Sequence, residues 1–324
     1  MIRGPVVLVM EPIINRLAIV GQGLIGSSIT RAVIQRGIAR EVVVTDASAK
    51  VRKRVAELGF GVAKVVDSNS EAVRNADLVI ACIPVGQYGA FAKEIKKHLK
   101  RDAIVSDVGS VKGSVVRAMT PHLPKYVQLV PAHPLAGTEH SGPDSGVASL
   151  FENRWCILTP PKKTSAAAVN KLKAFWEAIG SEVQIMSVRD HDHVLAITSH
   201  LPHLIAFAIF HTGLKEEEAL PAGVMKFSAG GFRDFTRIAS SNPTMWRDIF
   251  LNNKDAVLDV LKQFKSDLNK LAKAIERGNA EKLFDQLSIS RLTRRKVIEK
   301  EHISVVNPPK EDSKRSLTLY GSDD

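Results

Sequence analysis

One stretch of this sequence, AHPLAGTEHSGP at residues 132–143, gathers side chains that can exchange protons. His133 closely follows the apolar segment VQLV, and the residues after it are small, polar and turn-forming. An imidazole accepts a proton near neutral pH, and a turn at the end of a strand would fix the direction of its ring. The pattern favours His133 as an acid–base group, although a surface loop with an incidental histidine would have the same composition.

A second group of residues could bind a phosphate-bearing ligand. Gly21, Gly23 and Gly26 form the pattern G-x-G-x-x-G in VGQGLIGSSI, between a predicted strand and a predicted helix. There the first glycine permits a tight turn, the second lets the backbone approach a pyrophosphate, and the third lets helix and strand pack closely. We expect a dinucleotide on this loop, in contact with Leu24 and Ile25 as well; a glycine-rich turn without a ligand is the alternative.

An acid about twenty residues further on points to the kind of dinucleotide. Asp46 ends the predicted strand EVVVTD, where a carboxylate would bond a ribose 2′-hydroxyl and repel a 2′-phosphate. This spacing predicts NAD rather than NADP, unless Asp46 instead caps the following helix. Arg52 and Lys53 follow within a turn or two and could soften the discrimination.

Alternating strands and helices must position these groups. Short runs rich in valine and isoleucine are typical of strands buried on both faces, and helical patterns separate them. The predicted strands are RLAIV, EVVVTD, ADLVIACIP, AIVSDVG, VQLVPAH, WCILTP and EVQIMS. The predicted helices are Leu24–Arg36, Ala49–Leu58, Gly86–Leu99, Val111–Thr120 and Ser165–Ile179. This order predicts an α/β fold with a doubly wound, mostly parallel sheet, whose strand ends, with Ile83 and Pro84, line a ligand crevice.

The pattern changes near Ser187, and from Asp190 to about Arg295 we predict helices only. The segment LPHLIAFAIF is apolar nearly all round, as in a helix buried on several faces, and favours a homodimer built on this domain. We therefore predict four parts. They are an N-terminal extension at 1–15, a Rossmann-like NAD-binding domain at 16–188, a helical substrate-binding and dimerisation domain at 189–298, and a loose tail at 299–324.

The composition limits the class of protein. The chain has 324 residues, enough for roughly two domains, and a net charge of +11. Its basic residues are scattered among acidic ones, and no stripe of basic residues alternates with aromatic side chains. This pattern favours small anionic ligands over nucleic acid. Cys82 and Cys156 lie in apolar runs and indicate reduced thiols of a cytoplasmic protein. No apolar stretch is expected to span a membrane, and the N-terminus makes a poor signal peptide.

Five motifs in order make the chain resemble the prephenate and arogenate dehydrogenases of tyrosine biosynthesis. They are GQGLIGSSI, DVGSVKG, HPLAGTEHSGP, SHLPHLIAFAI and GGFRDFTRIASSNPTMWRDI, which together span roughly residues 16–295. The resemblance implies an NAD-linked oxidative decarboxylation. The hydrogen on ring carbon C4 leaves as hydride, the C4 hydroxyl loses its proton, and the ring carboxylate departs as carbon dioxide to leave an aromatic product.

The resemblance also implies roles for residues beside the reacting groups. His133 matches a histidine that contacts the substrate hydroxyl. Ser110 matches a serine that bonds this hydroxyl or the cofactor, although it could instead cap the helix that begins at Val111. Arg237 matches an arginine that holds a substrate carboxylate through two parallel hydrogen bonds, with a surface salt bridge as the alternative.

Other positions match pocket residues of the same family. His203 matches a pocket histidine, although a bonded core histidine would fit the same helix. Thr138 and Glu139 match positions that line the substrate pocket, and Glu139 could also be a gate or a surface acid. Asp234 could orient the nearby arginine or close a pocket across a dimer. Trp246 matches a tryptophan that relatives bring in from the neighbouring subunit, with an ordinary core residue as the alternative.

The sequence also offers three competing interpretations. His191 and His193 in HDHVLAITSH could suggest a metal, but no carboxylate or cysteine completes a convincing ligand set, and hydride transfer needs none. A β-hydroxyacid dehydrogenase would share the two-domain plan, but it usually needs a lysine that HDHVLAITSHLPHLIAFAIF lacks. A non-catalytic NAD-sensing protein would need the glycine loop but not His133 together with Arg237.

Overall fold

The computed structural model describes the backbone of residues 11–60, 63–138, 140–220 and 222–306. Residues 1–10 of the predicted N-terminal extension lie outside these ranges, and the first strand already begins within the extension, at Ile14. Residues 307–324 of the predicted tail also lie outside them, whereas the last helix continues past residue 298 to Val306. The chain divides into two compact units, at residues 1–260 and 261–324.

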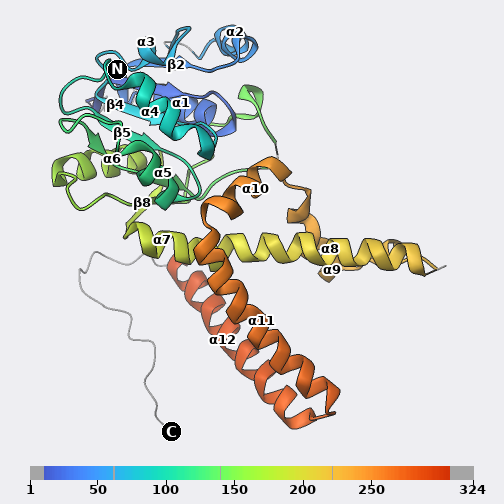
Figure 1. Cartoon of the computed structure of the whole chain (residues 1–324). Coiled ribbons are helices and arrows are strands. Elements are labelled where there is room, and N and C mark those ends of the chain that lie inside the picture. Colours follow the sequence, from blue (N-terminus) through green and yellow to red (C-terminus); the bar gives the residue numbers. More distant parts are fainter. Residues whose placement is uncertain (1–10, 61–62, 139, 221, 307–324) are drawn as a thin grey trace, which may run out of the picture. The chain divides into compact units, whose positions relative to one another are not determined.

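A six-stranded parallel sheet forms the centre of the first unit (Figure 1). The strands lie in the order β3-β2-β1-β4-β5-β6. They are β1 (Ile14–Val20), β2 (Ala39–Thr45), β3 (Ala63–Val65), β4 (Leu78–Ala81), β5 (Ile104–Asp107) and β6 (Gln128–Leu129). Val20 pairs with Thr45 on one side and Ala81 on the other, so β1 and β4 are neighbours although two strands separate them in sequence. The strand order reverses at this point, which is where such sheets bind ligands.

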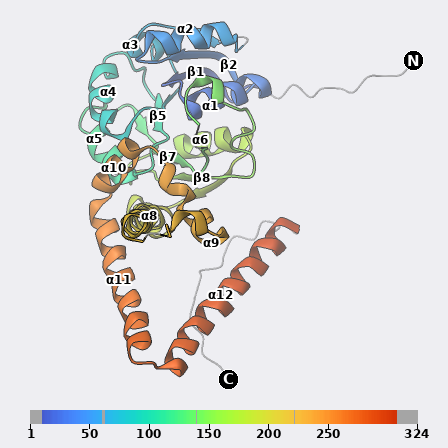
Figure 2. The ribbon, with the colours of Figure 1, turned by 90° about the vertical axis from the view of Figure 1, so that its right-hand side faces the viewer.

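Helices cover both faces of this sheet. Figure 2 shows α4 (Tyr88–Ile95) and α5 (Lys112–Met119) on one side and α1 (Leu24–Arg36) and α6 (Ala166–Ala178) on the other. Each pair contributes buried side chains to a separate apolar core against the strands. The helices α2 (Ala49–Leu58) and α3 (Asn69–Ala72) and the 3₁₀ turn η1 (Val85–Gln87) complete this layer. The predicted doubly wound α/β fold is thus confirmed.

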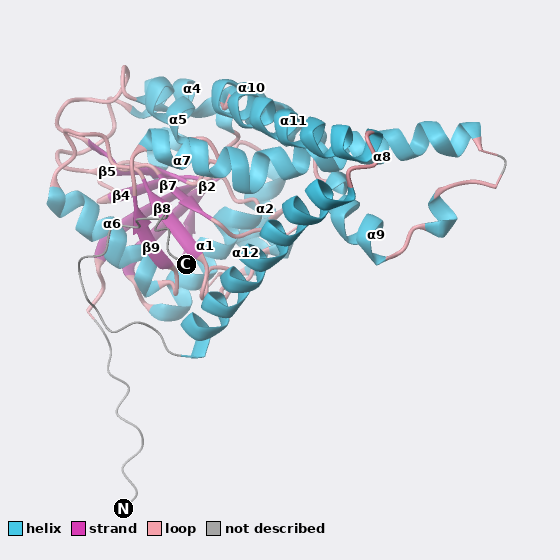
Figure 3. Ribbon diagram, turned by 90° about the horizontal axis from the view of Figure 1, so that it is seen from below, coloured by secondary structure: helices cyan, strands magenta, loops and turns pink. Residues whose placement is uncertain are grey.

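A second, three-stranded sheet was not predicted (Figure 3). It consists of β7 (Ala132–Pro134), β8 (Trp155–Leu158) and β9 (Glu182–Ile185), with β7 antiparallel to β8 and β9 parallel to it. The predicted strand VQLVPAH therefore divides into β6 and β7. The division falls at Pro131, which has no N–H to continue a ladder and whose carbonyl accepts a bond from the Thr159 amide at 2.9 Å. His133 consequently sits on β7, paired with Ile157.

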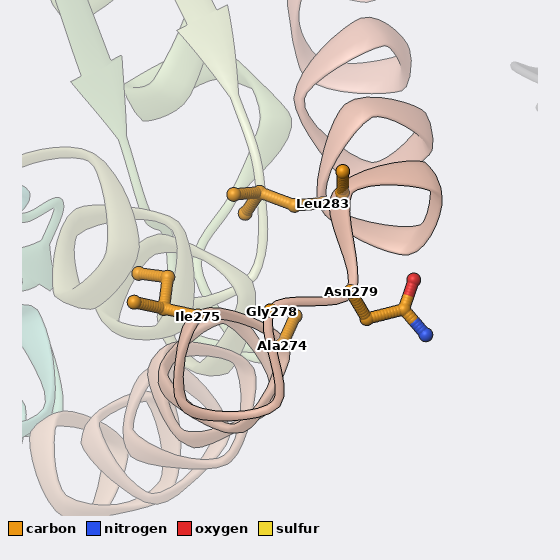
Figure 4. Close-up of a pocket in the computed structure, with 6 residues that line it drawn as sticks. Ala274, Ile275, Gly278, Asn279 and Leu283 are labelled. Carbon is orange, nitrogen blue, oxygen red and sulfur yellow. The ribbon is translucent and has the colours of Figure 1, made fainter.

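The described residues from Val188 to Val306 contain helices and turns and no strand, as predicted. In the first unit these are α7 (Val188–Leu195), a π-helical turn η3 (Ala196–His200), α8 (Leu201–Ala219), the 3₁₀ turn η4 (Met225–Phe227), α9 (Gly230–Thr236), the 3₁₀ turn η5 (Arg237–Ser240) and α10 (Pro243–Asn252). Helix α11 (Lys254–Glu276) crosses into the second unit, where a turn at Gly278 leads to α12 (Ala280–Val306). An open, mainly apolar pocket of about 250 Å³ lies at this turn, between Ile275 and Leu283 (Figure 4).

One helical stretch is long and apolar enough to cross a membrane, contrary to our expectation for this sequence. Helices α7 and α8 join through η3 into one unbroken helix, Val188–Ala219. Its apolar residues therefore form one long apolar segment, although polar residues lie between them in the sequence. Only 28% of the 18-residue segment with the highest mean hydropathy in this helix is buried within the single chain. One such helix is weak evidence for a membrane span, because a buried helix of a soluble protein passes the same test.

Candidate active site

The glycine loop between β1 and α1 has the geometry of a dinucleotide cradle. Gly21 has a φ of +89°, and a Cβ there would lie 2.2 Å from the carbonyl oxygen of Cys82. A Cβ on Gly26 would lie 1.9 Å from the carbonyl oxygen of Gly21, so both positions require glycine. At Gly23 a Cβ would meet nothing within 4 Å, and no side chain caps the start of α1 there. The amides of the first turn are thus open to an anionic group.

Asp46 lies at the end of β2, directly beside this loop. One carboxylate oxygen accepts a hydrogen bond from the amide of Gln22 at 2.8 Å, and the other accepts from the amide of Ser48 at 2.9 Å. Ser48, not Asp46, caps α2, since its side chain accepts from the Val51 amide. The helix-cap alternative is therefore wrong for Asp46. Arg52 donates to the carbonyl oxygen of Asp46 at 2.8 Å, which places a guanidinium beside the same edge.

The strand end of β4 faces the glycine loop. Ile83 is half-buried, and its Cγ2 would lie 3.3 Å from a Cβ on Gly21. Pro84 is exposed and leads into η1, which α10 of the helical domain contacts. Leu24 and Ile25 are half-buried at the start of α1. The predicted cofactor positions thus flank the point where the order of the strands reverses.

A fully buried ion pair fixes the strand end from which His133 projects. Asp107, at the end of β5, pairs with Lys112 of α5, and neither side chain is exposed. The carboxylate also accepts from the amides of Gly109 at 2.7 Å and Ala132 at 3.3 Å, while the Lys112 ammonium donates to the Ala132 carbonyl at 2.6 Å. Burial lowers the pKa of Lys112, although Asp107 opposes this shift. The pair holds the backbone on both sides of Ala132, immediately before His133.

His133 belongs to a hydrogen-bonded series of three side chains. Its Nδ1 lies 2.9 Å from Nε2 of His191, and Nδ1 of His191 lies 2.9 Å from a carboxylate oxygen of Asp192. His191 is fully buried, and His133 is 8% exposed. Nε2 of His133 makes no hydrogen bond within the described part of the chain, so it is the ring nitrogen left for a substrate.

The protonation of these histidines is set mainly by burial. Burial, His191, Lys112 and His200 together place the pKa of His133 well below its ordinary value. Burial likewise lowers the pKa of His191, against the opposing effect of Asp192. Burial lowers the pKa of His200 to about 4, and its Nδ1 accepts from the side-chain amide of Asn253 at 3.0 Å. All three rings are neutral at physiological pH.

Ser110 lies between the ion pair and the helical domain, where it is half-buried. It does not cap α5, because Val111 occupies the cap position and the Asp192 carboxylate accepts from the amides of Lys112 and Gly113 at 2.8 Å each. The Ser110 hydroxyl makes no hydrogen bond within the described residues. The helix-cap alternative is therefore wrong, and the hydroxyl is available to a ligand.

The helical domain contributes an aromatic pair and a cation. The ring of His203 stacks on Trp246 with centroids 3.7 Å apart, and Trp246 packs against Val111, next to Ser110. Trp246 is 5% exposed, so within this chain it is a core residue. Burial and the charge of Arg237 lower the pKa of His203. Arg237 itself is exposed and forms no ion pair within the described residues, so the salt-bridge alternative finds no support there.

The remaining predicted positions lie on exposed segments. Thr138 is exposed, and its hydroxyl accepts from the amide of His140 at 3.2 Å. Asp234 is exposed on α9, and no ion pair joins it to Arg237 within the described residues. Glu139 lies outside the described residues. Within the described ranges, no three histidine, cysteine, aspartate or glutamate side chains are grouped as a metal site.

Sequence interpretation missed the residues that support His133. Lys112 and Asp107 both lie in the motif DVGSVKG, but nothing local indicates that a lysine side chain is buried. In the sequence alone, His191 stands out only as a candidate metal ligand, and Asp192 has no role assigned to it. The order His-Asp at the start of a helix, with a second histidine on a strand end, is the signal that could have suggested a hydrogen-bonded series.

Two family models match the chain. Residues 29–185 match "Prephenate dehydrogenase, nucleotide-binding domain", and residues 187–289 match "Prephenate dehydrogenase, dimerization domain". The boundary between the two matches falls just after β9, where the strands end and α7 begins.

Three dehydrogenases are similar to this chain over most of its length. Cyclohexadienyl dehydrogenase of Zymomonas mobilis is 43% identical over 87% of this chain and 96% of its own length. Prephenate dehydrogenase of Bacillus subtilis is 37% identical over 85% of this chain and 74% of its own. The crystal structure of prephenate dehydrogenase from Aquifex aeolicus, in complex with hydroxyphenyl propionate and NAD+, superposes with a TM-score of 0.80 at 35% identity, covering 87% of this chain and 98% of that one. The chain belongs to the prephenate dehydrogenase family.

Proposed function

We propose that this protein catalyses the NAD-dependent oxidative decarboxylation of prephenate to 4-hydroxyphenylpyruvate. The observation that carries the proposal is His133. Its ring is held on one side by His191, its other ring nitrogen makes no hydrogen bond to the described residues, and it lies on a strand end whose backbone a buried ion pair fixes. The membership of the family and the similarity to an NAD-bound relative support the same reaction.

NAD is the cofactor, and the glycine loop fits it. The open amides at the start of α1 bind the pyrophosphate, Asp46 bonds the ribose 2′-hydroxyl, and Leu24, Ile25, Ile83 and Pro84 contact the remainder. The cofactor supplies the acceptor for the hydride that leaves ring carbon C4.

The residues of this chain handle the proton and the orientation of the substrate. His133 accepts the proton of the C4 hydroxyl through Nε2, and Ser110 bonds this hydroxyl or the cofactor. As the hydroxyl becomes a carbonyl, C4 loses its hydride. The electrons of the bond to the ring carboxylate then move into the ring, carbon dioxide leaves, and the C4 carbonyl becomes the oxygen of an aromatic phenolate. This oxygen takes back the proton held by His133, which gives the hydroxyl of the product and restores the base. The protein therefore needs alignment and a base, and it needs no metal for these steps.

The helical domain binds the anionic substrate. Arg237 pairs with a substrate carboxylate, and its guanidinium forms no ion pair within the described residues. His203 and Trp246 form one wall of the pocket through their stacked rings. Thr138 and Asp234 lie on exposed segments at its rim, and we assign Glu139 to the same rim from the family resemblance alone.

An assay with four combinations tests this function. The increase in NADH or NADPH absorbance is followed with prephenate and with arogenate, each in the presence of NAD or NADP. We expect turnover with prephenate and NAD. Arogenate carries an amino-acid side chain in place of the pyruvyl group. The ratio of its rate to that of prephenate measures how strongly the pocket discriminates between the two side chains. Absence of turnover with all four combinations would contradict the proposal.

Cofactor choice depends on Asp46. We expect the wild-type protein to prefer NAD, and Asp46→Ser to narrow the preference, because the change removes the carboxylate that repels a 2′-phosphate while Arg52 remains beside it. The measurement is kcat/KM for both cofactors in both proteins. Asp67→Ser, which removes the carboxylate that pairs with Arg52, is the matched control. A wild-type preference for NADP would show that Asp46 does not bind the ribose 2′-hydroxyl as proposed.

The protein acts as a soluble cytoplasmic homodimer that binds neither nucleic acid nor a membrane. The match to the dimerization domain supports the dimer, and so does the surface of α8. Between 37% and 43% of each of three large apolar side chains on this helix is exposed in the single chain: Ile209, Phe210 and Leu214. A second copy of the chain would cover this surface, with a closed two-fold interface.

We expect sedimentation at micromolar concentration to give the mass of a dimer. Leu214→Asp, which places a charge in the apolar surface of α8, is expected to shift the distribution toward monomer. Val147→Asp is the matched control, because Val147 is similarly exposed, at 47%, but lies in a loop of the other domain. A monomeric wild-type protein would refute the assignment of this surface.

A further inference from the structure

We propose that His191 and Asp192 form a positioning relay, which fixes the tautomer of His133 so that its Nε2 offers a lone pair to the substrate. Neither residue is expected to touch the substrate, because both act through the ring of His133. The inference rests on the proposed function, in which His133 is the base, and adds how this base is kept in its working form.

The geometry allows a single direction for the hydrogen bonds. Asp192, His191 and His133 follow one another at 2.9 Å per step. The rings of the two histidines are inclined at 63°, with centroids 5.1 Å apart, and Nδ1 of His133 and Nε2 of His191 are 2.9 Å apart, so the rings meet through one nitrogen of each. Three ring nitrogens take part, Nδ1 of His133 and both nitrogens of His191, and each has one partner. Each bond must therefore have one donor and one acceptor.

The series can be read from its charged end. Burial works to raise the pKa of Asp192, but hydrogen bonds from His191 and from the amides of Gly113 and Lys112 outweigh it and lower the pKa overall. Asp192 is thus an ionised carboxylate, which only accepts hydrogen bonds. Nδ1 of His191 must then carry the proton of the first bond.

The remaining protons follow in turn. His191 is neutral, since burial lowers its pKa, so its Nε2 holds a lone pair and accepts. Nδ1 of His133 must therefore donate to it. Because His133 is also neutral, its second nitrogen, Nε2, is left with a lone pair. Free histidine favours the opposite tautomer, with the proton on Nε2, so the relay holds His133 in the form that can act as a base.

The charged groups around the relay favour this neutral state. The Lys112 ammonium lies nearby, fully buried against Asp107, and it disfavours a second proton on either histidine. His200 acts in the same direction on His133. Within the described residues, Asp192 is the one acid hydrogen-bonded to the ring of His191; it and Asp107 act in the opposite direction on the pKa of His191, but burial outweighs them. The relay therefore orients and selects a tautomer, and it carries no net proton.

The anchor of the relay also belongs to the cofactor side of the site. The Asp192 carboxylate accepts from the amides of Lys112 and Gly113, the first residues of α5, which begins two residues after Ser110. One carboxylate of α7 thus holds the start of α5 and the ring of His191 together. This arrangement ties the position of the His133 ring to that of the Ser110 hydroxyl.

The tautomer can be measured without turnover. In the protein with NAD bound and its histidines labelled with nitrogen-15, two-dimensional NMR distinguishes a protonated from an unprotonated ring nitrogen, and the signal lost in His133→Asn identifies His133. We expect protonated Nδ1 and unprotonated Nε2. A wild-type protein with the proton on Nε2 would overturn the relay, whatever its activity.

Two substitutions of His191 test the relay by kinetics. His191→Phe keeps the ring volume but removes the acceptor, so we expect His133 to shift toward the Nε2–H tautomer. We expect kcat to fall roughly tenfold to a hundredfold, part of the share that a positioned base supplies, with KM and NAD affinity little changed. His191→Gln can donate to Asp192 and accept from His133 in the same sense as the histidine, so it is expected to recover most of kcat and the wild-type tautomer.

The controls separate the relay from folding and from the proposed function. His193→Phe makes the same change two residues away on the exposed side of α7 and should leave kcat and the tautomer unchanged. If His191→Phe does not fold, His191→Gln and the wild-type spectrum still decide the question. A folded His191→Phe with wild-type kcat and tautomer would overturn the relay. A protein without dehydrogenase activity would contradict the function and leave the tautomer result standing.

Discussion

Replacement of His133 by alanine is expected to lower kcat by about a hundredfold to ten-thousandfold, the usual share of a positioned acid–base group. The residue has no nearby substitute. Its neighbour His191 is fully buried and already bonded at both nitrogens, and Lys112 is bound to Asp107 and to a backbone carbonyl. The measurements are kcat and KM with prephenate and the dissociation constant of NAD. We expect this dissociation constant to stay nearly unchanged, because the glycine loop that binds NAD does not include His133.

His193→Ala serves as the control for this variant. Because His193 is exposed, its replacement removes an imidazole without changing the site. Turnover near the wild-type rate in His133→Ala would end the assignment of the base. A loss of NAD binding together with activity would place His133 on the cofactor side instead.

Arg237→Ala is expected to raise KM for prephenate about tenfold to a few hundredfold, with a smaller effect on kcat. The contact with a substrate carboxylate exists before hydride transfer and persists through it, so its loss removes binding that is common to the ground and transition states. A lost charge-assisted hydrogen bond costs roughly 1.5–3 kcal/mol, which corresponds to this range of KM. The affinity for NAD should hardly change.

Arg237→Lys and Arg247→Ala sharpen the test. The lysine should recover only part of the loss, because an ammonium cannot offer two parallel donors. Arg247 is exposed and already paired with Asp248, so its removal controls for the loss of one positive charge from the same domain. If Arg237→Ala leaves KM for prephenate unchanged and weakens NAD binding, Arg237 belongs to the cofactor site and does not hold the substrate carboxylate.

Helices α1 and α2 could be predicted closely because their ends are marked locally, whereas the short helix α3 was not predicted. The predicted bounds of α1 and α2 agree with the structure to the residue. Gly37 adopts the left-handed conformation that ends α1, and the Ser48 side chain caps the start of α2. Such signals lie within a few residues of the boundary, so a sequence alone contains them.

The supporting residues of the site could not be predicted in the same way. The hydrogen bond from Lys112 to Asp192 joins positions 80 residues apart in sequence, and only the packing of α5 against α7 brings them together. The split of VQLVPAH depends on β8, which offers β7 a partner some 25 residues later in the chain. His133 itself was found because a strand end followed by a turn is visible locally.

The π-helical turn η3 (Ala196–His200) determines which way α8 faces. A π turn holds one residue more than an α-helical turn, and each residue of an α-helix turns the chain by about 100°. Deletion of one residue from this turn would restore a regular helix and rotate α8 by about that angle relative to α7 and to Trp246, which packs against Val111. His203 would leave the face of Trp246, and the exposed apolar side chains of α8 would point elsewhere. A single codon in this turn therefore sets both the alignment of the pocket wall and the orientation of the surface that a second copy would cover.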